Sequence, residues 1–372
     1  MAHRRDDVIL GVDVGTSGVK VLAMDARGGV VETATAPLTL QTPHPGWAEQ
    51  DPDAWWAASR EAVCTVTSRL GGARVAAIGL SGQMHSSVFL DARGAVVRPA
   101  LLWCDARTGA ECDEITARVG PERLREWTCN AALAGFTLPK ILWLRKHEPE
   151  AFARTAKVVL AKDYVRYRLT GALATDPSDA SGTLLYDVAH DRWSRDMLDA
   201  AGLPASLLPS VVASAEISGR VTPDVAADLG LPAGTPVVGG GSDNACAALG
   251  VGVAAPGDAA ASWGTSGIVL APTSRPVVDP LLRAHTFRHA VPDTWYVIGV
   301  VLSAGAAFAW VRDQLARDLA GLPDADQRLD AEAASVAPGA GGLTFLPYLQ
   351  GERTPHRDPS ARGALVGLTL AH

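Results

Sequence analysis

The motif Gly-Thr-Ser-Gly occurs twice in this sequence, at residues 15–18 and again at residues 264–267. Both copies stand between apolar runs, such as VILGVDV before the first copy and IVLAP after the second. Apolar, β-branched runs joined by small turn residues are typical of β-hairpins. Four matching residues can arise by chance, but a match within the same strand–turn–strand pattern is much less expected. The repeat therefore predicts two domains of related fold, each beginning its sheet with the same hairpin.

Segments with strand patterns alternate with segments with helix patterns through the first part of the chain. A helix is expected from Asp51 to about Leu70, because Asp is a favoured N-cap and Pro52 fits the first turn. Strands are expected at 8–14, 19–24, 30–36, 75–80 and 158–161, and further helices at 139–146 and 163–170. This alternation predicts an α/β protein. The Gly- and Ala-rich stretch 252–257 is the expected linker, which gives domains of residues 1–252 and 253–372.

Residues 294–311 carry no charge and approach the length of a membrane span. Gly299 and Gly305 interrupt this segment, whose first half is β-branched and whose second half is rich in alanine. We therefore expect a buried strand that leads into a buried helix, rather than a membrane-spanning helix.

The charge and cysteine content exclude several classes of function. The chain has 33 Lys and Arg against 40 Asp and Glu, a net charge of −7, and no run of Lys or Arg is longer than two residues. Binding to nucleic acid or to a membrane is therefore not expected. The five cysteines show no CxxC spacing, so they predict reduced thiols in a cytoplasmic protein.

The first turn has the features of an anion site. Gly15, Thr16 and Ser17 are small and leave backbone N–H groups exposed, and successive N–H groups in a tight turn bind anions. Asp13 ends the preceding strand, where a carboxylate can hold Mg²⁺ through water. An ordinary glycine-rich hairpin with a solvated aspartate explains this turn equally well. The functional interpretation is favoured by the second turn, because two such turns could hold a polyphosphate from both sides. The second turn consists of Gly264, Thr265 and Ser266.

Three glycines at 239–241 precede Ser242 and Asp243. Glycines leave room for a ligand to approach the backbone and the carboxylate closely. Asp243 is expected to be the N-cap of an Ala-rich helix over 244–249, and the helix dipole would keep its carboxylate ionised at neutral pH. A weak base of this kind suffices for phosphoryl transfer, which depends mainly on positioning. The simpler alternative is that Asp243 only caps the helix.

A strand is also followed by Gln83, Met84, His85 and Ser86. Hydrogen-bonding groups beside an apolar, polarisable side chain suit a polyol ligand. A lone histidine is more often a structural residue than a ligand contact, so this motif carries little weight by itself.

These motifs together resemble the FGGY family of carbohydrate kinases, from residue 8 to residue 372. The resemblance implies an α/β fold of two actin-like (ribonuclease H-like) domains around a cleft. The sugar would bind to the N-terminal domain and ATP mainly to the C-terminal domain, with Mg²⁺ between them. The resemblance rests on VDVGTSGVK at 12–20, LSGQMHS at 80–86, GFTLPKILWLRKH at 135–147, GGGSDNA at 239–245, SWGTSG at 262–267 and FLPYLQGERTP at 345–355.

The resemblance also implies roles for individual residues. Asp243 would accept the proton of the sugar hydroxyl, and Asp13 would lie near the metal and the phosphates. Gln83, Met84 and His85 would bind the substrate, and the Met84-His85 pair favours a member that phosphorylates a ketose over one that phosphorylates glycerol. Gly264, Thr265 and Ser266 would form a second phosphate turn, facing Gly15, Thr16 and Ser17.

The activity implied by the resemblance is the ATP-dependent phosphorylation of D-xylulose to D-xylulose 5-phosphate. The alternatives are a related kinase for another ketose or polyol, and a sugar-binding protein without catalysis. The sequence does not decide whether the protein forms a homodimer. In the family, roughly a hundred further residues follow the position of His372, about the size of a small domain. We therefore expect an incomplete second domain that lacks the glycine-rich loop for adenosine, and an impaired activity. Ser242 stands where the family more often has glycine.

Overall fold

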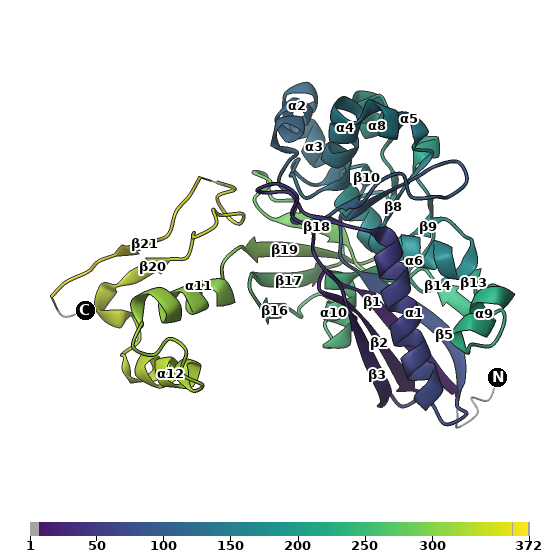
Figure 1. Cartoon of the computed structure of the whole chain (residues 1–372). Coiled ribbons are helices and arrows are strands. Elements are labelled where there is room, and N and C mark those ends of the chain that lie inside the picture. Colours follow the sequence, from purple (N-terminus) through teal and green to yellow (C-terminus); the bar gives the residue numbers. More distant parts are fainter. Residues whose placement is uncertain (1–6, 359, 371–372) are drawn as a thin grey trace.

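The computed structural model describes residues 7–358 and 360–370, which form two main sheets (Figure 1). The first sheet has the strand order β13-β14-β5-β1-β2-β3, with β15 beside β5. β1 pairs with β2 in antiparallel fashion and with β5 in parallel fashion. The strands of the first sheet are β1 (Asp7–Val14), β2 (Gly18–Asp25), β3 (Val30–Pro37), β5 (Arg74–Gly82), β13 (Ile217–Arg220), β14 (Pro236–Val238) and β15 (Gly241–Ser242).

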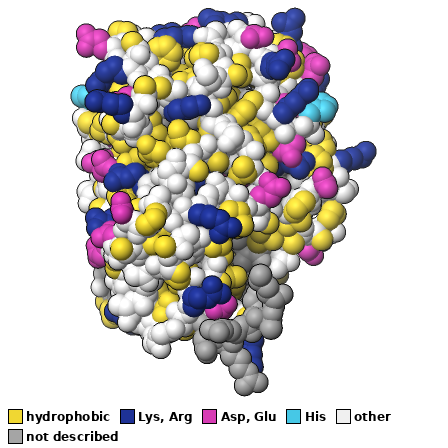
Figure 2. All heavy atoms as spheres, turned by 90° about the vertical axis from the view of Figure 1, so that its right-hand side faces the viewer, with side chains coloured by type: hydrophobic (Ala, Val, Ile, Leu, Met, Phe, Trp, Pro, Cys, Tyr) yellow, Lys and Arg dark blue, Asp and Glu magenta, His cyan; other side chains and the backbone are white. Residues whose placement is uncertain are grey.

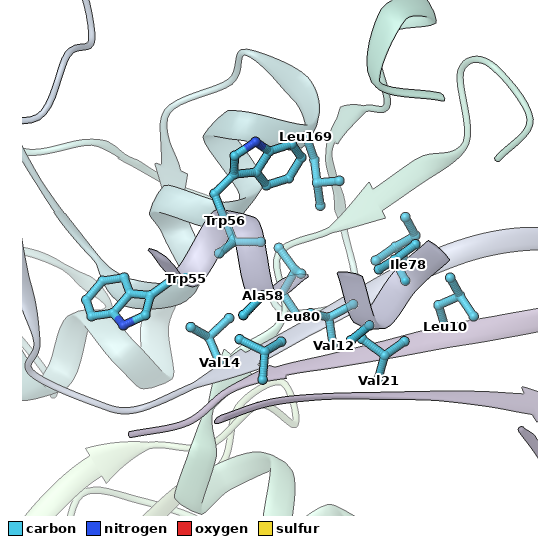
Figure 3. Close-up of a cluster of buried hydrophobic side chains, with 14 of the residues drawn as sticks. Leu10, Val12, Val14, Val21, Trp55, Trp56, Ala58, Ile78, Leu80 and Leu169 are labelled. Carbon is cyan, nitrogen blue, oxygen red and sulfur yellow. The ribbon is translucent and has the colours of Figure 1, made fainter. Parts of the chain in front are cut away.

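Helix α1 (Pro52–Arg69) covers one face of the first sheet. Asp51 caps it as expected, because its carboxylate accepts a hydrogen bond of 2.9 Å from the backbone N–H of Asp53. Every second residue of β1 and β2 is buried, so one face of this hairpin is apolar. Figure 3 shows Trp55 and Trp56 of α1 together with side chains from this face of the sheet. The core of the first domain lies in this layer.

Helices α2 to α5 lie together at the top of Figure 1, and α6 lies beside α1. A small sheet of order β4-β7-β6-β8 joins this part to the first sheet through the loop after β5. The helices are α2 (Gly109–Val119), α3 (Pro121–Thr128), α4 (Thr137–His147), α5 (Pro149–Arg154), α6 (Ala161–Thr170), α7 (Pro177–Ala180), α8 (Arg195–Ala201), α9 (Pro223–Leu229) and α10 (Asp243–Gly250). The short strands are β4 (Glu49–Gln50), β6 (Ser87–Leu90), β7 (Ala100–Leu101), β8 (Lys157–Leu160), β9 (Ala174–Thr175), β10 (Tyr186–Asp187), β11 (Arg192–Trp193) and β12 (Ser210–Val211).

The second sheet is antiparallel throughout and has the order β16-β17-β19-β18. Its strands are β16 (Ala260–Trp263), β17 (Gly267–Thr273), β18 (His285–Arg288) and β19 (Trp295–Val301). The second Gly-Thr-Ser-Gly motif joins β16 to β17, as the first joins β1 to β2, so the hairpin predicted from the repeat is confirmed at both places. Beyond this sheet, Figure 1 shows α11 (Gly305–Trp310), α12 (Ala325–Ser335), β20 (Thr344–Leu346) and β21 (Ala364–Val366) extending away from the first domain.

The uncharged segment 294–311 forms β19 and α11, which confirms the expected strand followed by a helix. Within residues 7–358 and 360–370, no helix has the length and apolar character needed to cross a membrane. On the face that Figure 2 shows, positive and negative side chains are interspersed among hydrophobic ones.

Candidate active site

A cavity of about 290 Å³ lies between the first domain and the second sheet. Its size suits a small polar ligand. Its polar groups come from several elements far apart in the sequence, and an apolar wall comes from β17 and β19. The cavity is lined by His85 from the loop after β5, Asp243 and Asn244 from α10, Ser266 from the second turn, His285 from β18, and Arg353.

Two glycines bring Asp243 to this cavity. A Cβ on Gly240 would lie 2.1 Å from the carbonyl oxygen of Leu80, and φ is +71° there. A Cβ on Gly239 would lie 2.3 Å from the carbonyl oxygen of Ala213. Only glycine allows the chain to pass this close to its neighbours and then begin α10. The glycine run therefore serves the placement of Asp243 as well as the approach of a ligand.

A buried cluster of charges supports this glycine run from behind. Lys162 forms ion pairs with Asp163 at 2.7 Å, Asp176 at 2.8 Å and Asp179 at 3.0 Å, and all four side chains are fully buried. Ser178, two residues after Asp176, accepts a 2.9 Å hydrogen bond from the backbone N–H of Ser242. A buried charge that loses its partner is strongly destabilising, so this cluster fixes the local backbone firmly.

Ser242 is the N-cap of α10, and the prediction that Asp243 is the N-cap is wrong. The hydroxyl of Ser242 accepts the backbone N–H of Ala245 at 3.4 Å, and Asp243 is the first residue of the helix. The Asp243 carboxylate instead accepts hydrogen bonds from the backbone N–H and the side-chain amide of Asn244, at 2.7 and 3.0 Å. Because Ser242 caps the helix, the carboxylate of Asp243 is available to the cavity.

The protonation of Asp243 also differs from the expectation based on the helix dipole. Loss of hydration, with a smaller contribution from the charge of Asp13, raises the pKa of Asp243 to about 7, against the opposing hydrogen bonds from the backbone N–H groups of Asn244 and Met84. Desolvation thus outweighs the helix dipole. A carboxylate with a pKa near neutrality is a much better proton acceptor than an ordinary surface aspartate.

Asp13 lies at the end of β1, opposite Lys20 on β2 and Ser81 on β5. Partial desolvation raises the pKa of Asp13, while the Ser81 hydrogen bond and the charge of Lys20 lower it. Asp13, Lys20 and Asp243 line a second hollow of about 660 Å³, so Asp243 stands where the cavity and this hollow meet.

The two carboxylates fit a magnesium site of the kind that is completed by a substrate. Mg²⁺ is usually held by one or two carboxylates together with substrate phosphates and water. Asp13 and Asp243 are close enough for the charge of one to raise the pKa of the other, and a cation between them would relieve that repulsion. In the part of the chain that the structure describes, no group of three or more His, Cys, Asp and Glu could hold a metal without a substrate.

Met84 and His85, the predicted substrate contacts, both line the cavity. The Nδ1 of His85 lies 2.7 Å from the carbonyl oxygen of Gly182, so Nδ1 carries a proton and donates it. Burial lowers the pKa of His85 to about 3, which keeps the ring neutral and leaves Nε2 as an acceptor. The ring stacks on Phe136, with 4.5 Å between centroids. His85 therefore offers a ligand one fixed acceptor beside an aromatic wall.

Gln83 does not line this cavity. Its side-chain oxygen accepts the hydroxyl of Thr16 at 3.2 Å, and its amide nitrogen donates to the carbonyl oxygen of Gly15 at 3.2 Å. Gln50 also donates to the carbonyl oxygen of Thr16, at 2.7 Å. The side chain of Gln83 therefore stabilises the first turn.

Neither Gly15, Thr16 nor Ser17 lines the cavity, but Trp103 connects the first turn to it. The Trp103 indole N–H donates to the Thr16 hydroxyl at 2.9 Å, and the ring lies on the cavity wall. In the second turn, Gly264 and Ser266 line the cavity, whereas Thr265 does not.

The residues that flank the second turn, Trp263 and Gly267, line a larger, mostly apolar groove of about 1220 Å³ between the second sheet, α11 and α12. The backbone N–H groups of Gly305 and Ala304 donate to the carbonyl oxygens of Gly264 and Thr265, at 2.8 and 3.0 Å. The start of α11 therefore holds the second turn. Ser262 and Val300 line both the groove and the smaller cavity, so the two spaces are neighbours.

Sequence reasoning missed several residues of the cavity, namely Trp103, Asn244, His285, Phe287 and Arg353. A signal for two of them existed, because His285 and Phe287 are two residues apart in a strand and so share a face. Arg353 belongs to a motif that supported the family resemblance but received no role of its own.

The side chains of Asp105 and Arg107, which follow Trp103 in the chain, are both buried and form an ion pair with each other at 2.7 Å.

Two models of protein families match this chain. The model for the N-terminal domain of the FGGY family of carbohydrate kinases matches residues 8–250, and the model for the C-terminal domain of the same family matches residues 259–372. Together they cover almost the whole chain.

Curated relatives and solved structures agree with these matches. A xylulose kinase of Escherichia coli (strain K12) is 43% identical over 98% of this chain and 73% of its own length. The crystal structure of a xylulose kinase (titled "xyloylose kinase") from Brucella ovis is 40% identical, with a TM-score of 0.92 over 98% of this chain and 74% of that one. A Plasmodium falciparum glycerol kinase with ADP has a TM-score of 0.87 at 22% identity, over 98% of this chain and 73% of that one, a likeness that concerns the fold alone.

Proposed function

This chain belongs to the FGGY family of carbohydrate kinases, and from that premise we propose that it transfers the terminal phosphate of ATP to D-xylulose, giving D-xylulose 5-phosphate and ADP. The observation that carries the proposal is the position of Asp243. Its carboxylate stands between a cavity of sugar size and a hollow that holds Asp13, and its pKa is about 7. The similarity to xylulose kinases supports the choice of sugar.

In the proposed reaction the 5-hydroxyl oxygen of the sugar forms a bond to the γ-phosphorus of ATP. The bond from that phosphorus to the bridging oxygen breaks, and ADP leaves. Asp243 accepts the proton of the hydroxyl. Because the transition state of phosphoryl transfer is loose, this proton leaves late, and a carboxylate held in position is a sufficient base.

Asp13 is the residue that we propose to hold Mg²⁺, through water, which leaves Asp243 free to accept the proton. The ion would neutralise charge on the phosphate oxygens. Lys20 lies opposite Asp13 in the β1–β2 hairpin and adds a positive charge to the same hollow.

We place the sugar on the N-terminal domain, residues 1–252, and the nucleotide mainly on residues 253–372. Gly264 and Ser266 of the second turn line the sugar cavity, and the residues that flank this turn, Trp263 and Gly267, line the apolar groove. Phosphates at this turn would therefore face the sugar, while the apolar groove would bind the adenine ring of ATP. The first turn would bind the phosphates from the opposite side.

The cytoplasm, where ATP is abundant, is the proposed compartment.

A panel assay tests the proposal. ADP release is followed with D-xylulose, other ketopentoses, xylitol and glycerol, on the unaltered chain and on Asp243→Asn. We expect the largest kcat/KM with D-xylulose, and loss of that activity in the variant. A larger kcat/KM with another ketose or a polyol would favour the related-kinase alternative, and ADP release that is unchanged in Asp243→Asn would contradict the role of Asp243.

A further inference from the structure

Arg353 is the only Lys or Arg among the described residues that line the sugar cavity. Its Nε donates a hydrogen bond of 3.2 Å to Nε2 of His285. Within residues 7–358 and 360–370, no carboxylate forms an ion pair with it, although the neighbouring Glu352 is buried. Glu352 instead accepts the backbone N–H groups of His356 and Arg357. A partly buried guanidinium without a counter-charge is costly, so its presence in a cavity indicates a ligand contact.

Arg353 lies at the aromatic part of the cavity wall, beside His285 and Phe287. Its hydrogen-bond partner His285 packs against Phe136 and Phe287, with ring centroids 5.7 Å apart in both pairs. His85 stacks on the same Phe136. The charge of Arg353 lowers the pKa of both histidines, whereas the charge that acts on Asp243 is that of Asp13. Arg353 therefore belongs to the aromatic end of the cavity.

The Arg353–His285 pair offers a ligand donors only. Because Nε2 of His285 accepts from Arg353, the proton of the neutral ring must be on Nδ1. Nδ1 is buried and has no partner among the described residues. Burial and the charge of Arg353 keep the pKa of His285 well below its usual value, so the ring stays neutral. The guanidinium also cannot accept a hydrogen bond.

The chemistry of the proposed reaction requires an acceptor at this end of the substrate. A 2-ketopentose that closes to a five-membered ring uses O5 to do so, and O5 is then not available for phosphorylation. The reacting form is therefore the open chain, in which C2 carries a free carbonyl oxygen that only accepts hydrogen bonds. We infer that Arg353, oriented by His285, donates to this C2 carbonyl while O5 lies at Asp243, and so selects the open-chain ketose over polyols. This inference rests on the proposed function.

Arg353→Met tests it with a side chain of similar reach but no donors. We expect D-xylulose affinity, measured by calorimetry without ATP, to fall roughly 10- to 100-fold, as for a lost charged hydrogen bond. Affinity for xylitol, which has a hydroxyl at C2, should change by less than about threefold. Arg353→Lys, which keeps the charge with fewer donors, should fall between. Arg357→Met is the matched control, because Arg357 lies in the same loop and is exposed.

Several outcomes would overturn the inference. An equal loss for D-xylulose and xylitol would show a general effect on the pocket, and a raised KM for ATP with unchanged D-xylulose affinity would place Arg353 at the phosphates. If Arg353→Met does not fold, as judged by thermal unfolding, Arg353→Lys and His285→Gln decide by the same two affinities, and equal losses would again count against it. A chain that binds D-xylulose through Arg353 but releases no ADP would refute the proposed function and leave this inference standing. Absence of D-xylulose binding by the unaltered chain would overturn both.

Discussion

The two Gly-Thr-Ser-Gly turns share a sequence and a hairpin, but they are held in place differently. In the first turn, the backbone N–H of Leu38 donates to the carbonyl oxygen of Ser17, and side chains add further bonds, since Gln83 and Trp103 both bond to the hydroxyl of Thr16. Main-chain groups fix the second turn, since Ala304 and Gly305 donate to its carbonyl oxygens. Among the residues that the structure describes, the hydroxyl of Thr265 has no comparable partner, and its side chain is exposed. The same local sequence can therefore be a rigid part of one domain and a more open edge of the other.

The residues just before each turn differ as well. Asp13 in the first hairpin corresponds to Ser262 in the second, so only the first carries a negative charge. Val14 is fully buried, whereas Trp263 at the matching position is 76% exposed beside the apolar groove. The comparison suggests a division of labour, in which the first hairpin serves the metal and the second serves phosphate oxygens and the nucleotide.

The largest effect is expected from the residue that stands between the two hairpins. Asp243→Asn keeps the shape of the side chain but removes the base, so kcat should fall by about two to four orders of magnitude. KM for D-xylulose should change much less. Steady-state kinetics measures both, and Asn244→Asp is a useful companion because it adds a carboxylate one position away. Near-normal turnover in Asp243→Asn would mean that another group accepts the proton, and that the reaction does not take place at Asp243.

Matched substitutions at Asp13 and Ser262 test the division of labour directly. Asp13→Asn should raise the Mg²⁺ concentration for half-maximal rate by about 10- to 100-fold, the usual cost of disturbing a metal site. Ser262→Ala should change it less than about threefold. The measurement is a magnesium titration of the initial rate. Equal effects at the two positions would show that both hairpins hold the metal, and would contradict the proposed division of labour between them.

The pH dependence of the reaction should also differ between substitutions at Asp13 and at Ser262. Asp243 accepts a proton only as a carboxylate, and its pKa is about 7. Activity should therefore be present above about pH 7 and should fall by up to about tenfold per pH unit below it. Asp13→Asn removes a charge that raises the pKa of Asp243, so the acid limb should move to lower pH. Ser262→Ala should leave the limb in place. A limb near pH 4 in the unaltered chain would contradict the burial of Asp243.

The smallest effect is expected from the two threonines of the repeat. Thr16→Val removes the hydroxyl that pairs with both Gln83 and Trp103, and should lower the free energy of unfolding by about 1–2 kcal/mol. Thr265→Val should change it by less than about 0.5 kcal/mol, as for other exposed positions. Chemical denaturation measures both, and similar values would mean that the second turn is tied as firmly as the first.

The sequence predicted local structure well wherever neighbouring residues decide it. The two hairpins, the capped start of α1 and the strand-to-helix segment at 294–311 all follow from nearby residues. The cap of α10 was misassigned, because Ser242 and Asp243 are both good N-caps and only the path of the glycine run decides between them. The family resemblance supplied the sugar and the reaction, which local patterns could not.

The chemistry of the site depends on contacts between distant segments, which a single sequence does not reveal. The pKa of Asp243 is set by loss of hydration in the fold and by Asp13, 230 positions earlier in the chain. Gln83 looked like a ligand contact beside Met84 and His85, yet its side chain turns to the first hairpin. Arg353 and His285 meet only through the tertiary fold, so no spacing rule could pair them.

The distance along the chain between His85 and Arg353 also has a consequence for synthesis. A ribosome adds about 5–20 residues per second, so the roughly 270 residues between these positions take roughly 15–50 s to make. During that time a growing chain can already hold the wall formed by Met84 and His85, but not the donors at the aromatic end. If Arg353 binds the C2 carbonyl as inferred, D-xylulose can stabilise the newly made protein through Arg353 only after this residue has been added. A ribosome that pauses before codon 353 then leaves a pocket that cannot yet distinguish a ketose from a polyol.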